Sequence, residues 1–195
     1  VEQFPNLIKV AITGSSGKTT TKELVVSVLK QKYNVVYTQG NFNSETGLPL
    51  SVFKIRKEHE VGVFEMGMNR QDEIGEISKV LKPEYAIITN IGSAHIGMLG
   101  SRDNIAIEKK KAFTYVSKTG AVFIPAEDEY CNFLQKDVLG KVVLFGENVP
   151  SEISHVKYLE DCGLSGSVFC LDGIQINLKI PGIYNYRNAL ASIAL

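Results

Sequence analysis

Short apolar runs alternate with amphipathic segments along the first three quarters of the chain. The runs are rich in β-branched and aromatic residues and have the length of buried strands. They occupy residues 7–12, 34–38, 61–66, 85–91, 121–125 and 142–145. Runs that are apolar on both faces are typical of a parallel sheet covered by helices on its two sides. We therefore expect an α/β fold with a mostly parallel sheet flanked by helices.

Three of the intervening segments repeat apolar residues at helical spacing. The first begins near residue 18, the second spans residues 72–81, and the third begins near Asp103, which is a suitable N-cap residue. Their expected apolar faces are Leu24, Val25, Val28 and Leu29 in the first, Ile74, Ile77, Val80 and Leu81 in the second, and Ile105, Ala106, Ala112, Phe113 and Val116 in the third.

The pattern changes beyond Gly146. Residues 153–158, 167–171 and 174–180 resemble antiparallel strands, and Asp172-Gly173 between the last two is a two-residue hairpin turn signal. We expect a small antiparallel sheet within about residues 141–182, packed at one edge of the parallel sheet. A turn from Pro181 then leads into a final helix.

The segment LIKVAITGSSGKTTT, residues 7–21, reads as a buried strand, a glycine turn and a helix start. Gly14 and Gly17 allow a ligand to approach the backbone closely. Free N–H groups and the positive dipole end at a helix N-terminus favour a phosphate there. Lys18 then reaches the outer phosphates, and the Thr19 hydroxyl is a ligand for phosphate-bound Mg²⁺. The first glycine is closer to the second than in the usual P-loop, and an incidental strand–helix turn is the alternative.

Polar residues follow the ends of other predicted strands, where parallel sheets bind ligands. Glu65 closes the third strand and is either an exposed carboxylate or a metal ligand or water-orienting base at the phosphate site. His95 follows the fourth strand and is either a structural residue or a ligand. The polar loop at residues 39–49 follows the second strand, and ordinary turn chemistry explains its composition equally well.

Three consecutive lysines interrupt the third amphipathic helix. Lys109 lies in the middle of its apolar face, midway between Ile105 and Phe113, whereas Lys110 lies at the edge and Lys111 points away. A solvated charged face explains Lys111. An inward lysine costs several kcal/mol unless it is paired or chemically altered, so Lys109 is a candidate for a functional group.

Composition excludes several classes of protein. The 195 residues are 44% hydrophobic and 22% charged, with a formal net charge of zero, so nothing favours a nucleic acid or membrane surface as partner. The three cysteines lack metal-site spacing, and with no secretory segment they fit a reducing cytoplasm. The chain lacks an initiating Met and ends in the middle of an apparent helix, so we expect one domain of a longer protein. We also expect that protein to be a monomer.

Together these motifs resemble the Mur ligases, ATP-dependent amide-bond-forming enzymes of peptidoglycan precursor synthesis. TGSSGKTT is similar to the family's T-G-T-x-G-K-T-[ST] phosphate loop. The resemblance is strongest to members that add D-alanyl-D-alanine to UDP-N-acetylmuramoyl-tripeptide. It rests on TQGNFNSETGLPL, FEMGMNRQDEI, TNIGSAHIGMLGSRDNIA and PGIYNYRNALA. It implies that residues 1–195 are the central ATP-binding domain, without the family's N-terminal UDP-binding and C-terminal Rossmann-like domains.

The resemblance also implies roles for individual residues. ATP would be held by Gly14, Ser15, Ser16, Gly17, Lys18, Thr19, Thr20, Asn185 and Asn188, the last reading adenine. Magnesium would be served by Thr19, Glu65, His95 and a carbamylated Lys109. Lys18, His95 and Lys109 would be catalytic, and the loop with Asn41, Asn43 and Ser44 would face the UDP-muramoyl substrate.

Three positions depart from the family pattern. Tyr184 stands where His is usual, Lys111 replaces a common Glu, and Gly97 stands where an acidic residue is frequent. Alternatives also stay open: another Mur-type ligase that adds an amino acid, a P-loop kinase or ATPase, or a nucleotide-binding module that does not catalyse ligation in isolation. A kinase or ATPase would share Lys18 and Thr19 but has no need of Lys109 or the N-x-x-N segment.

Overall fold

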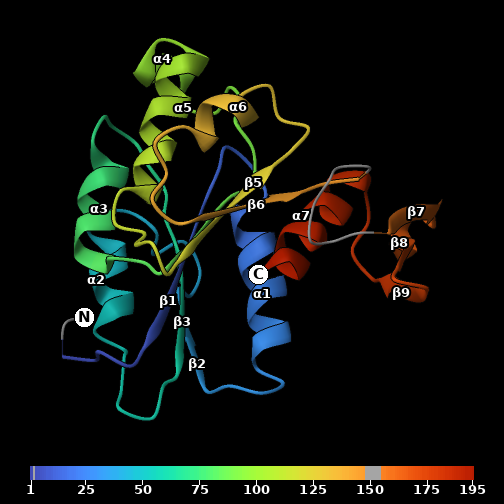
Figure 1. Ribbon diagram of the computed structural model, residues 1–195, viewed down its shortest axis with the longest axis horizontal. Helices are drawn as coiled ribbons and strands as arrows, with labels where there is room; N and C mark the ends of the chain where they lie inside the picture. The colour runs from blue at the N-terminus through green and yellow to red at the C-terminus, as the bar shows by residue number, and fades with distance from the viewer. Residues whose placement is uncertain (2, 148–154) are drawn as a thin grey trace.

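A computed structural model describes residues 1, 3–147 and 155–195. Its centre is a six-stranded sheet in the order β2-β3-β1-β4-β5-β6, in which every pair of neighbours is parallel (Figure 1). The strands are β1 (Ile8–Thr13), β2 (Val35–Tyr37), β3 (Val61–Glu65), β4 (Tyr85–Ile88), β5 (Ala121–Pro125) and β6 (Lys141–Phe145). The α/β class and all six predicted strands are confirmed.

The strand register brings the ends of the central strands together. Ile12 of β1 is paired with Glu65 of β3, and Thr13 is paired with Ile88 of β4. Because the strands are parallel, the residues that follow them emerge at one edge of the sheet, where ligands bind in such folds.

Helices cover both faces of the sheet (Figure 1). On one face, α1 (Lys18–Leu29) and α7 (Ile183–Ala194) share a core with Val10, Ile12 and Ile87. On the other face lie α2 (Gly47–Val52), α3 (Glu73–Leu81), α5 (Arg102–Lys110) with the 3₁₀ turn η1 (Lys111–Phe113), and α6 (Cys131–Gln135). The short helix α4 (Ile96–Leu99) projects above the sheet.

The structure corrects details of the predicted helices. Val28 of α1 and Val80 of α3 are exposed, although both were expected on apolar faces. In α1, Val26 is buried instead of Val28. The predicted loop at residues 39–49 ends in α2, which begins at Gly47. Helices α4 and α6 were not predicted, because segments of four and five residues are too short to show a helical period.

The start of α5 also differs from expectation. Ser101, and not Asp103, is the N-cap residue, and its hydroxyl accepts a hydrogen bond from the Asn104 N–H at 3.1 Å. Asp103 lies in the first turn, where its side chain accepts a hydrogen bond from the Tyr130 hydroxyl. Asp103 therefore favours the helix through the dipole and not as the cap.

Replacing Ser101 by alanine is expected to lower the free energy of unfolding by about 1 kcal/mol, because the Asn104 N–H loses its side-chain acceptor. Chemical denaturation of the Ser101→Ala protein measures this loss. Ser101→Asp, which restores an acceptor, is the matched control and should recover most of the stability. Equal stability of the alanine variant and the wild type would contradict the assignment of the cap.

A separate three-stranded antiparallel sheet lies beyond α7, in the order β7-β8-β9 (Figure 1). Its strands are β7 (Val156–Asp161), β8 (Ser167–Leu171) and β9 (Ile174–Leu178), with the 3₁₀ turn η2 (Gly163–Ser165) before β8. Asp172 and Gly173 both have positive φ angles, 49° and 82°, as the predicted hairpin turn requires. The predicted sheet is confirmed, but β6 belongs to the parallel sheet. Part of the predicted strand 153–158 lies outside the described residues.

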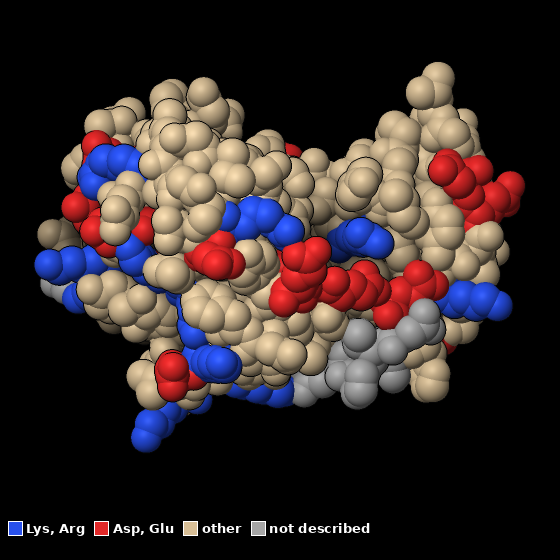
Figure 2. Space-filling model, turned by 90° about the horizontal axis from the view of Figure 1, so that it is seen from above, with Lys and Arg blue, Asp and Glu red and all other residues tan. Residues whose placement is uncertain are grey.

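Among the helices that the structure describes, none has the length and apolar character needed to cross a bilayer. The three cysteines all fall within the described residues, and each is a free thiol. On the face seen in Figure 2, Lys and Arg side chains and Asp and Glu side chains both occur, and acidic side chains form a band right of the centre.

Candidate functional site

The turn between β1 and α1 requires glycine at two positions. A side chain at Gly14, where φ is 151°, would put its Cβ 1.8 Å from Thr89 Oγ1. A Cβ at Gly17, where φ is 78°, would lie 2.3 Å from Asn188 Oδ1. Gly17 is also the N-cap residue of α1 and offers no side chain to the free N–H groups of the first turn. The turn is therefore open to an anion, as the sequence predicts.

Two lysines point at the same carbonyl group of this turn. Nζ of Lys18 and Nζ of Lys109 each donate a hydrogen bond to the Gly14 oxygen, both at 3.0 Å. Lys109 is 1% exposed, which confirms that it faces inward from the apolar side of α5. Burial lowers the pKa of Lys109 to about 7, with a further contribution from the charge of Lys18 and an opposing one from Glu108. Burial likewise lowers the pKa of Lys18, against the attraction of Glu65.

Glu65 joins the same site from β3. It is 1% exposed, so the interpretation as an exposed carboxylate is wrong. Its Oε2 accepts a hydrogen bond from the Thr19 hydroxyl at 2.9 Å, and its Oε1 accepts one from Asn43 Nδ2 at 2.7 Å. The Glu65 backbone N–H is held by Thr38 Oγ1 at 3.1 Å. A buried carboxylate is thus aimed at the first turn of α1.

His95 lies in the segment after β4. It precedes α4 as the N-cap residue, with a φ angle of 71°. Burial lowers the pKa of His95, and the charges of Lys109 and Lys18 lower it further, while Glu73 opposes them. Lys109 thus contacts the glycine turn from α5 and Glu65 contacts the adjoining Thr19 from β3, whereas His95 is linked to them by the effect of the lysine charges on its pKa.

Thr89 and Asn90, which sequence reasoning missed, hold the other side of the turn. Thr89 Oγ1 donates a hydrogen bond to the Ser16 carbonyl at 2.5 Å. The Asn90 side chain accepts a hydrogen bond from the Ser16 N–H and donates one to the Ser16 hydroxyl, and the Asn90 backbone carbonyl accepts one from the Ser15 N–H. The position of the two residues immediately after β4 was the available signal, since parallel strand ends meet at one edge.

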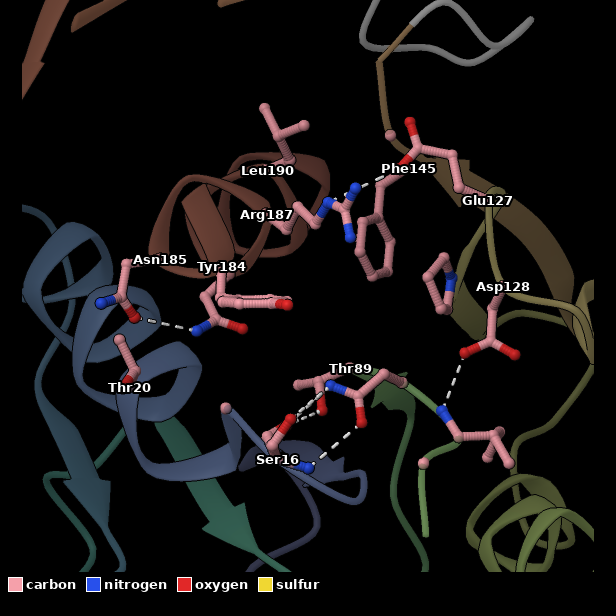
Figure 3. Close-up of a pocket in the computed structure, with 17 residues that line it drawn as sticks. Ser16, Thr20, Thr89, Glu127, Asp128, Phe145, Tyr184, Asn185, Arg187 and Leu190 are labelled. Atoms are coloured by element: carbon pink, nitrogen blue, oxygen red, sulfur yellow. Dashed lines mark hydrogen bonds and ion pairs between the residues drawn. The ribbon is translucent and has the colours of Figure 1, made fainter. Parts of the chain in front are cut away.

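A cavity of about 540 Å³ opens beside the turn and lies between it, α7 and the ends of β5 and β6 (Figure 3). Asn188 is buried on α7 and donates a hydrogen bond to Asn185 Oδ1 at 3.1 Å. Both line the cavity, as do Ser16, Gly17, Thr20, Tyr184 and Arg187. The volume and mixed polar and aromatic lining are those of a small-molecule site.

The three loop residues with an expected substrate role are placed differently. Asn43 lies at the site through its bond to Glu65. Ser44 accepts a hydrogen bond from the Gly47 N–H at the start of α2, and Asn41 is exposed on the loop.

The structure shows the environment of Lys111 and Tyr184, two of the residues that depart from the family pattern. Lys111 does not point away into solvent, as expected, but forms ion pairs with Asp72 and with Glu108, the latter at 2.6 Å. The buried Glu108 carboxylate in turn accepts hydrogen bonds from the N–H groups of Asp72 and Ile74 at the start of α3. Tyr184 is 74% exposed at the rim of the cavity.

Within residues 1, 3–147 and 155–195, no cluster of three or more His, Cys, Asp and Glu side chains is arranged to hold a metal ion. The oxygen atoms of Thr19 and Glu65, 2.9 Å apart, are nevertheless the donors that Mg²⁺ prefers. This ion usually keeps several waters and takes one or two carboxylates together with substrate phosphates. The pair therefore fits an ion that arrives with a nucleotide.

Comparison with known proteins identifies similar chains. The family model described as the Mur ligase middle domain matches residues 12–195. A UDP-N-acetylmuramoyl-tripeptide--D-alanyl-D-alanine ligase of Treponema pallidum is 46% identical, over 100% of this chain and 41% of that protein. The enzyme of the same name from Bacillus subtilis is 35% identical, over 95% of this chain and 40% of that protein. The chain thus spans about two fifths of these relatives.

Solved structures give the same result. MurF from Acinetobacter baumannii superimposes with a TM-score of 0.90 at 32% identity, over 99% of this chain and 43% of that one. MurF ligase from Thermotoga maritima, solved in complex with ADP, gives a TM-score of 0.81 at 30% identity, over 98% of this chain and 45% of that one.

Proposed function

This chain belongs to the Mur ligase family, whose middle domain it matches over residues 12–195, and from that membership we propose that it is the ATP-binding domain of a D-alanyl-D-alanine-adding ligase. The acceptor of the dipeptide is UDP-N-acetylmuramoyl-tripeptide, and the product contains a new amide bond. The N-terminal UDP-binding and C-terminal Rossmann-like domains of the family complete the enzyme. It acts in the cytoplasm, where ATP and UDP-linked precursors are available, and as a monomer, which sedimentation of the full-length protein tests.

One observation carries this proposal. Lys18 and Lys109 both bond the Gly14 carbonyl, while the Thr19–Glu65 pair lies at the same turn, next to a cavity of nucleotide size. A P-loop kinase or ATPase accounts for Lys18 and Thr19 alone. The buried Lys109 and the contact of Asn188 with the Gly17 position favour the ligase.

The reaction is phosphoryl transfer from ATP to the carboxylate of the tripeptide, followed by attack of the D-alanyl-D-alanine amine on the resulting acyl phosphate. A carboxylate is a poor electrophile and repels the γ-phosphate, so positive groups must neutralise the developing charge. Lys18 and the free N–H groups of α1 supply that neutralisation at the glycine turn. The buried Glu65 orients the Thr19 hydroxyl toward the same region.

Mg²⁺ is the proposed cofactor, held through Thr19 and Glu65, with His95 and a carbamylated Lys109 serving a second position. When bound, it neutralises phosphate oxygens as a Lewis acid. Asn188 and Asn185 orient the adenine ring in the cavity, and the loop with Asn41, Asn43 and Ser44 faces the UDP-linked substrate.

Ligation assays on the full-length protein that contains this chain test the proposal. ADP release is expected only when the UDP-linked tripeptide is present, and the amide product only when D-alanyl-D-alanine is added. The 195-residue chain alone is expected to make no amide product, since residues of the site for the attacking D-alanyl-D-alanine lie on another domain. ADP release without the tripeptide would favour an ATPase, and incorporation of a single amino acid would favour another Mur-type ligase.

Replacing Asn188 by alanine is expected to weaken ADP binding about tenfold, the loss of one or two hydrogen bonds to the base. Titration calorimetry on the full-length protein measures the affinity. Asn177→Ala, on the exposed side of β9, is the matched control and should leave it unchanged. An unaltered affinity in the Asn188→Ala protein would remove this residue from the nucleotide site.

A further inference from the structure

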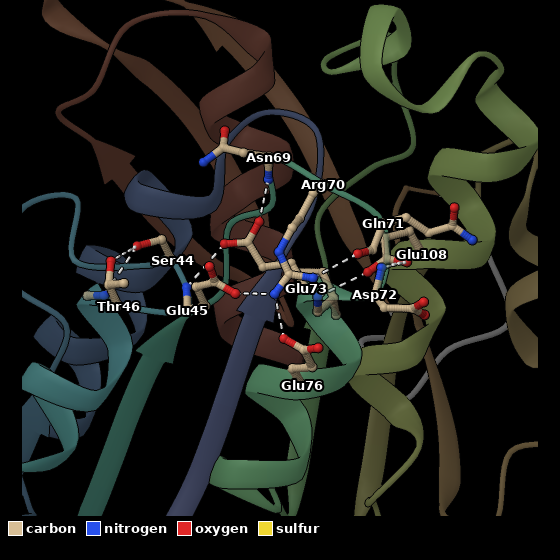
Figure 4. A network of polar contacts seen from close by, with 12 residues as sticks. Ser44, Glu45, Thr46, Asn69, Arg70, Gln71, Asp72, Glu73, Glu76 and Glu108 are labelled. Carbon is tan, nitrogen blue, oxygen red and sulfur yellow. Dashed lines mark hydrogen bonds and ion pairs between the residues drawn. The ribbon is translucent and has the colours of Figure 1, made fainter.

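Glu73, at the first position of α3, joins two loops that lie far apart in sequence (Figure 4). Its Oε1 accepts a hydrogen bond from the Glu45 N–H at 3.1 Å, and its Oε2 accepts one from the Asn69 N–H at 2.6 Å. The residue is 3% exposed. The charge of a carboxylate buried in this way is stabilised by the backbone N–H donors and by the positive end of its own helix.

An exposed set of charges reinforces the same junction from outside. Arg70, in the second loop, forms ion pairs with Glu45 of the first loop and with Glu76 of α3, the latter at 2.5 Å (Figure 4). These side chains are 45–59% exposed, and surface ion pairs of this kind contribute little on their own. The buried Glu73 carboxylate is therefore the main connection between the loops.

The junction leads directly to the phosphate site. The Asn43 carbonyl accepts a hydrogen bond from the Gly67 N–H at 2.7 Å, so the two loops also touch beside Glu65. Asn43 Nδ2 then donates to Glu65 Oε1 at 2.7 Å. The segment from Asn43 to Glu45 is thus bonded at one end to the carboxylate that holds Thr19, and at the other end to Glu73.

We propose that Glu73 is a positioning residue. It fixes the loop at residues 41–46, and this loop holds the UDP-linked substrate at the correct place relative to the Thr19–Glu65 pair. We place the action of Glu73 in the hydrogen bonds that hold the loop of Asn43, in addition to the effect of its charge on the pKa of His95. The inference rests on the proposed function for the identity of the substrate, but the geometry of the junction is independent of it. Loss of the junction frees the loop and weakens binding of that substrate more than binding of ATP.

Glu73→Gln in the full-length protein tests the inference. The amide has one acceptor oxygen, and its NH₂ group opposes the second backbone N–H, so one of the two bonds is lost. We expect the KM for UDP-N-acetylmuramoyl-tripeptide to rise about tenfold, as for loss of a charge-assisted bond, and the KM for ATP to change less than twofold. Glu76→Gln, an exposed carboxylate on the same helix, is the matched control and should change neither value.

A double-mutant cycle with Asn43→Ala separates positioning from general destabilisation. If Glu73 acts through Asn43, the Glu73→Gln change raises the KM for UDP-N-acetylmuramoyl-tripeptide less than twofold in a protein that already carries Asn43→Ala. Additive effects, or an unchanged KM for the UDP-linked substrate in Glu73→Gln, would overturn the inference. ADP affinity within twofold of wild type shows that the variants are folded.

Amide hydrogen exchange gives a readout without any substrate. Exchange of the Glu45 and Asn69 amides is expected to accelerate in Glu73→Gln and to stay unchanged in Glu76→Gln. If the wild-type protein makes no amide product, the proposed function fails while this result still decides the positioning role. Equal protection of both amides in the wild type and Glu73→Gln would reject that role even in an active enzyme.

Discussion

Replacing Lys18 by alanine is expected to lower kcat of the full-length ligase by about 10²–10³-fold, the usual cost of removing one group that stabilises transition-state charge. Lys18 is the cation at the start of α1, and its Nζ lies 3.0 Å from the Gly14 carbonyl at the glycine turn. In the proposed phosphoryl transfer, negative charge develops on the leaving phosphate oxygen and is spread over the equatorial oxygens of the transferred group, so we expect this cation to matter more in the transition state than in the ground state.

Because Lys18 is expected to stabilise the transition state more than the bound nucleotide, kcat and ADP affinity should respond differently to its removal. Initial rates at saturating ATP report kcat, and calorimetry reports ADP affinity, which should fall much less than kcat. Lys30→Ala is the matched control, because Lys30 is an exposed lysine that follows the same helix and stacks on Tyr37. Unchanged ADP release by the Lys18→Ala enzyme would refute the assigned role.

Much of the fold is predictable from the sequence because the responsible patterns are local. A strand buried on both faces is mostly apolar at consecutive positions, and each of the six runs contains at least two consecutive apolar residues. The inward position of Lys109 follows from helical spacing relative to Ile105 and Phe113, and burial of all three confirms it. The turn between β1 and α1 could be predicted because it needs residues without a Cβ at positions 14 and 17, and both are glycine.

What the sequence does not reveal depends on contacts between distant segments. Glu73 and Glu108 look like ordinary surface acids on helices, yet both are buried because backbone N–H groups from other elements surround them. Ser101 and Asp103 are both suitable caps, and only the chain path before α5 decides between them. Thr89 and Asn90 are common residue types whose role depends on the neighbouring turn.

Replacing Lys109 by alanine or by methionine is expected to lower ligation by at least about 10²-fold, because the site loses a group that carries charge next to Lys18. A pKa of about 7 makes the neutral amine available near neutral pH. Its nitrogen can then bond the carbon of CO₂, which gives a carbamate and releases one proton. In the unmodified residue Nζ donates to the Gly14 carbonyl and is repelled by the charge of Lys18, and we expect the carbamate to keep one N–H for that carbonyl and to attract Lys18.

Three measurements distinguish this carbamate from a purely structural lysine. Removing dissolved CO₂ should lower wild-type activity and adding bicarbonate should restore it, with a carbamate resonance visible by NMR under ¹³CO₂. Short carboxylates such as acetate should partly rescue Lys109→Ala. Lys110→Ala is the matched control, since Lys110 lies next in sequence but donates to the Phe133 carbonyl and should retain activity.

Thermal unfolding provides a further test, because a functional lysine predicts that stability and activity change in opposite directions when Lys109 is replaced by methionine. Methionine fills the volume of a buried lysine without the cost of a buried charge, so Lys109→Met should unfold at an equal or higher temperature while its activity is lost. A structural lysine predicts the reverse, a lower unfolding temperature with activity falling in parallel. Full ligation by Lys109→Ala without any additive would eliminate the modified lysine and leave Lys18 as the principal cation of the site.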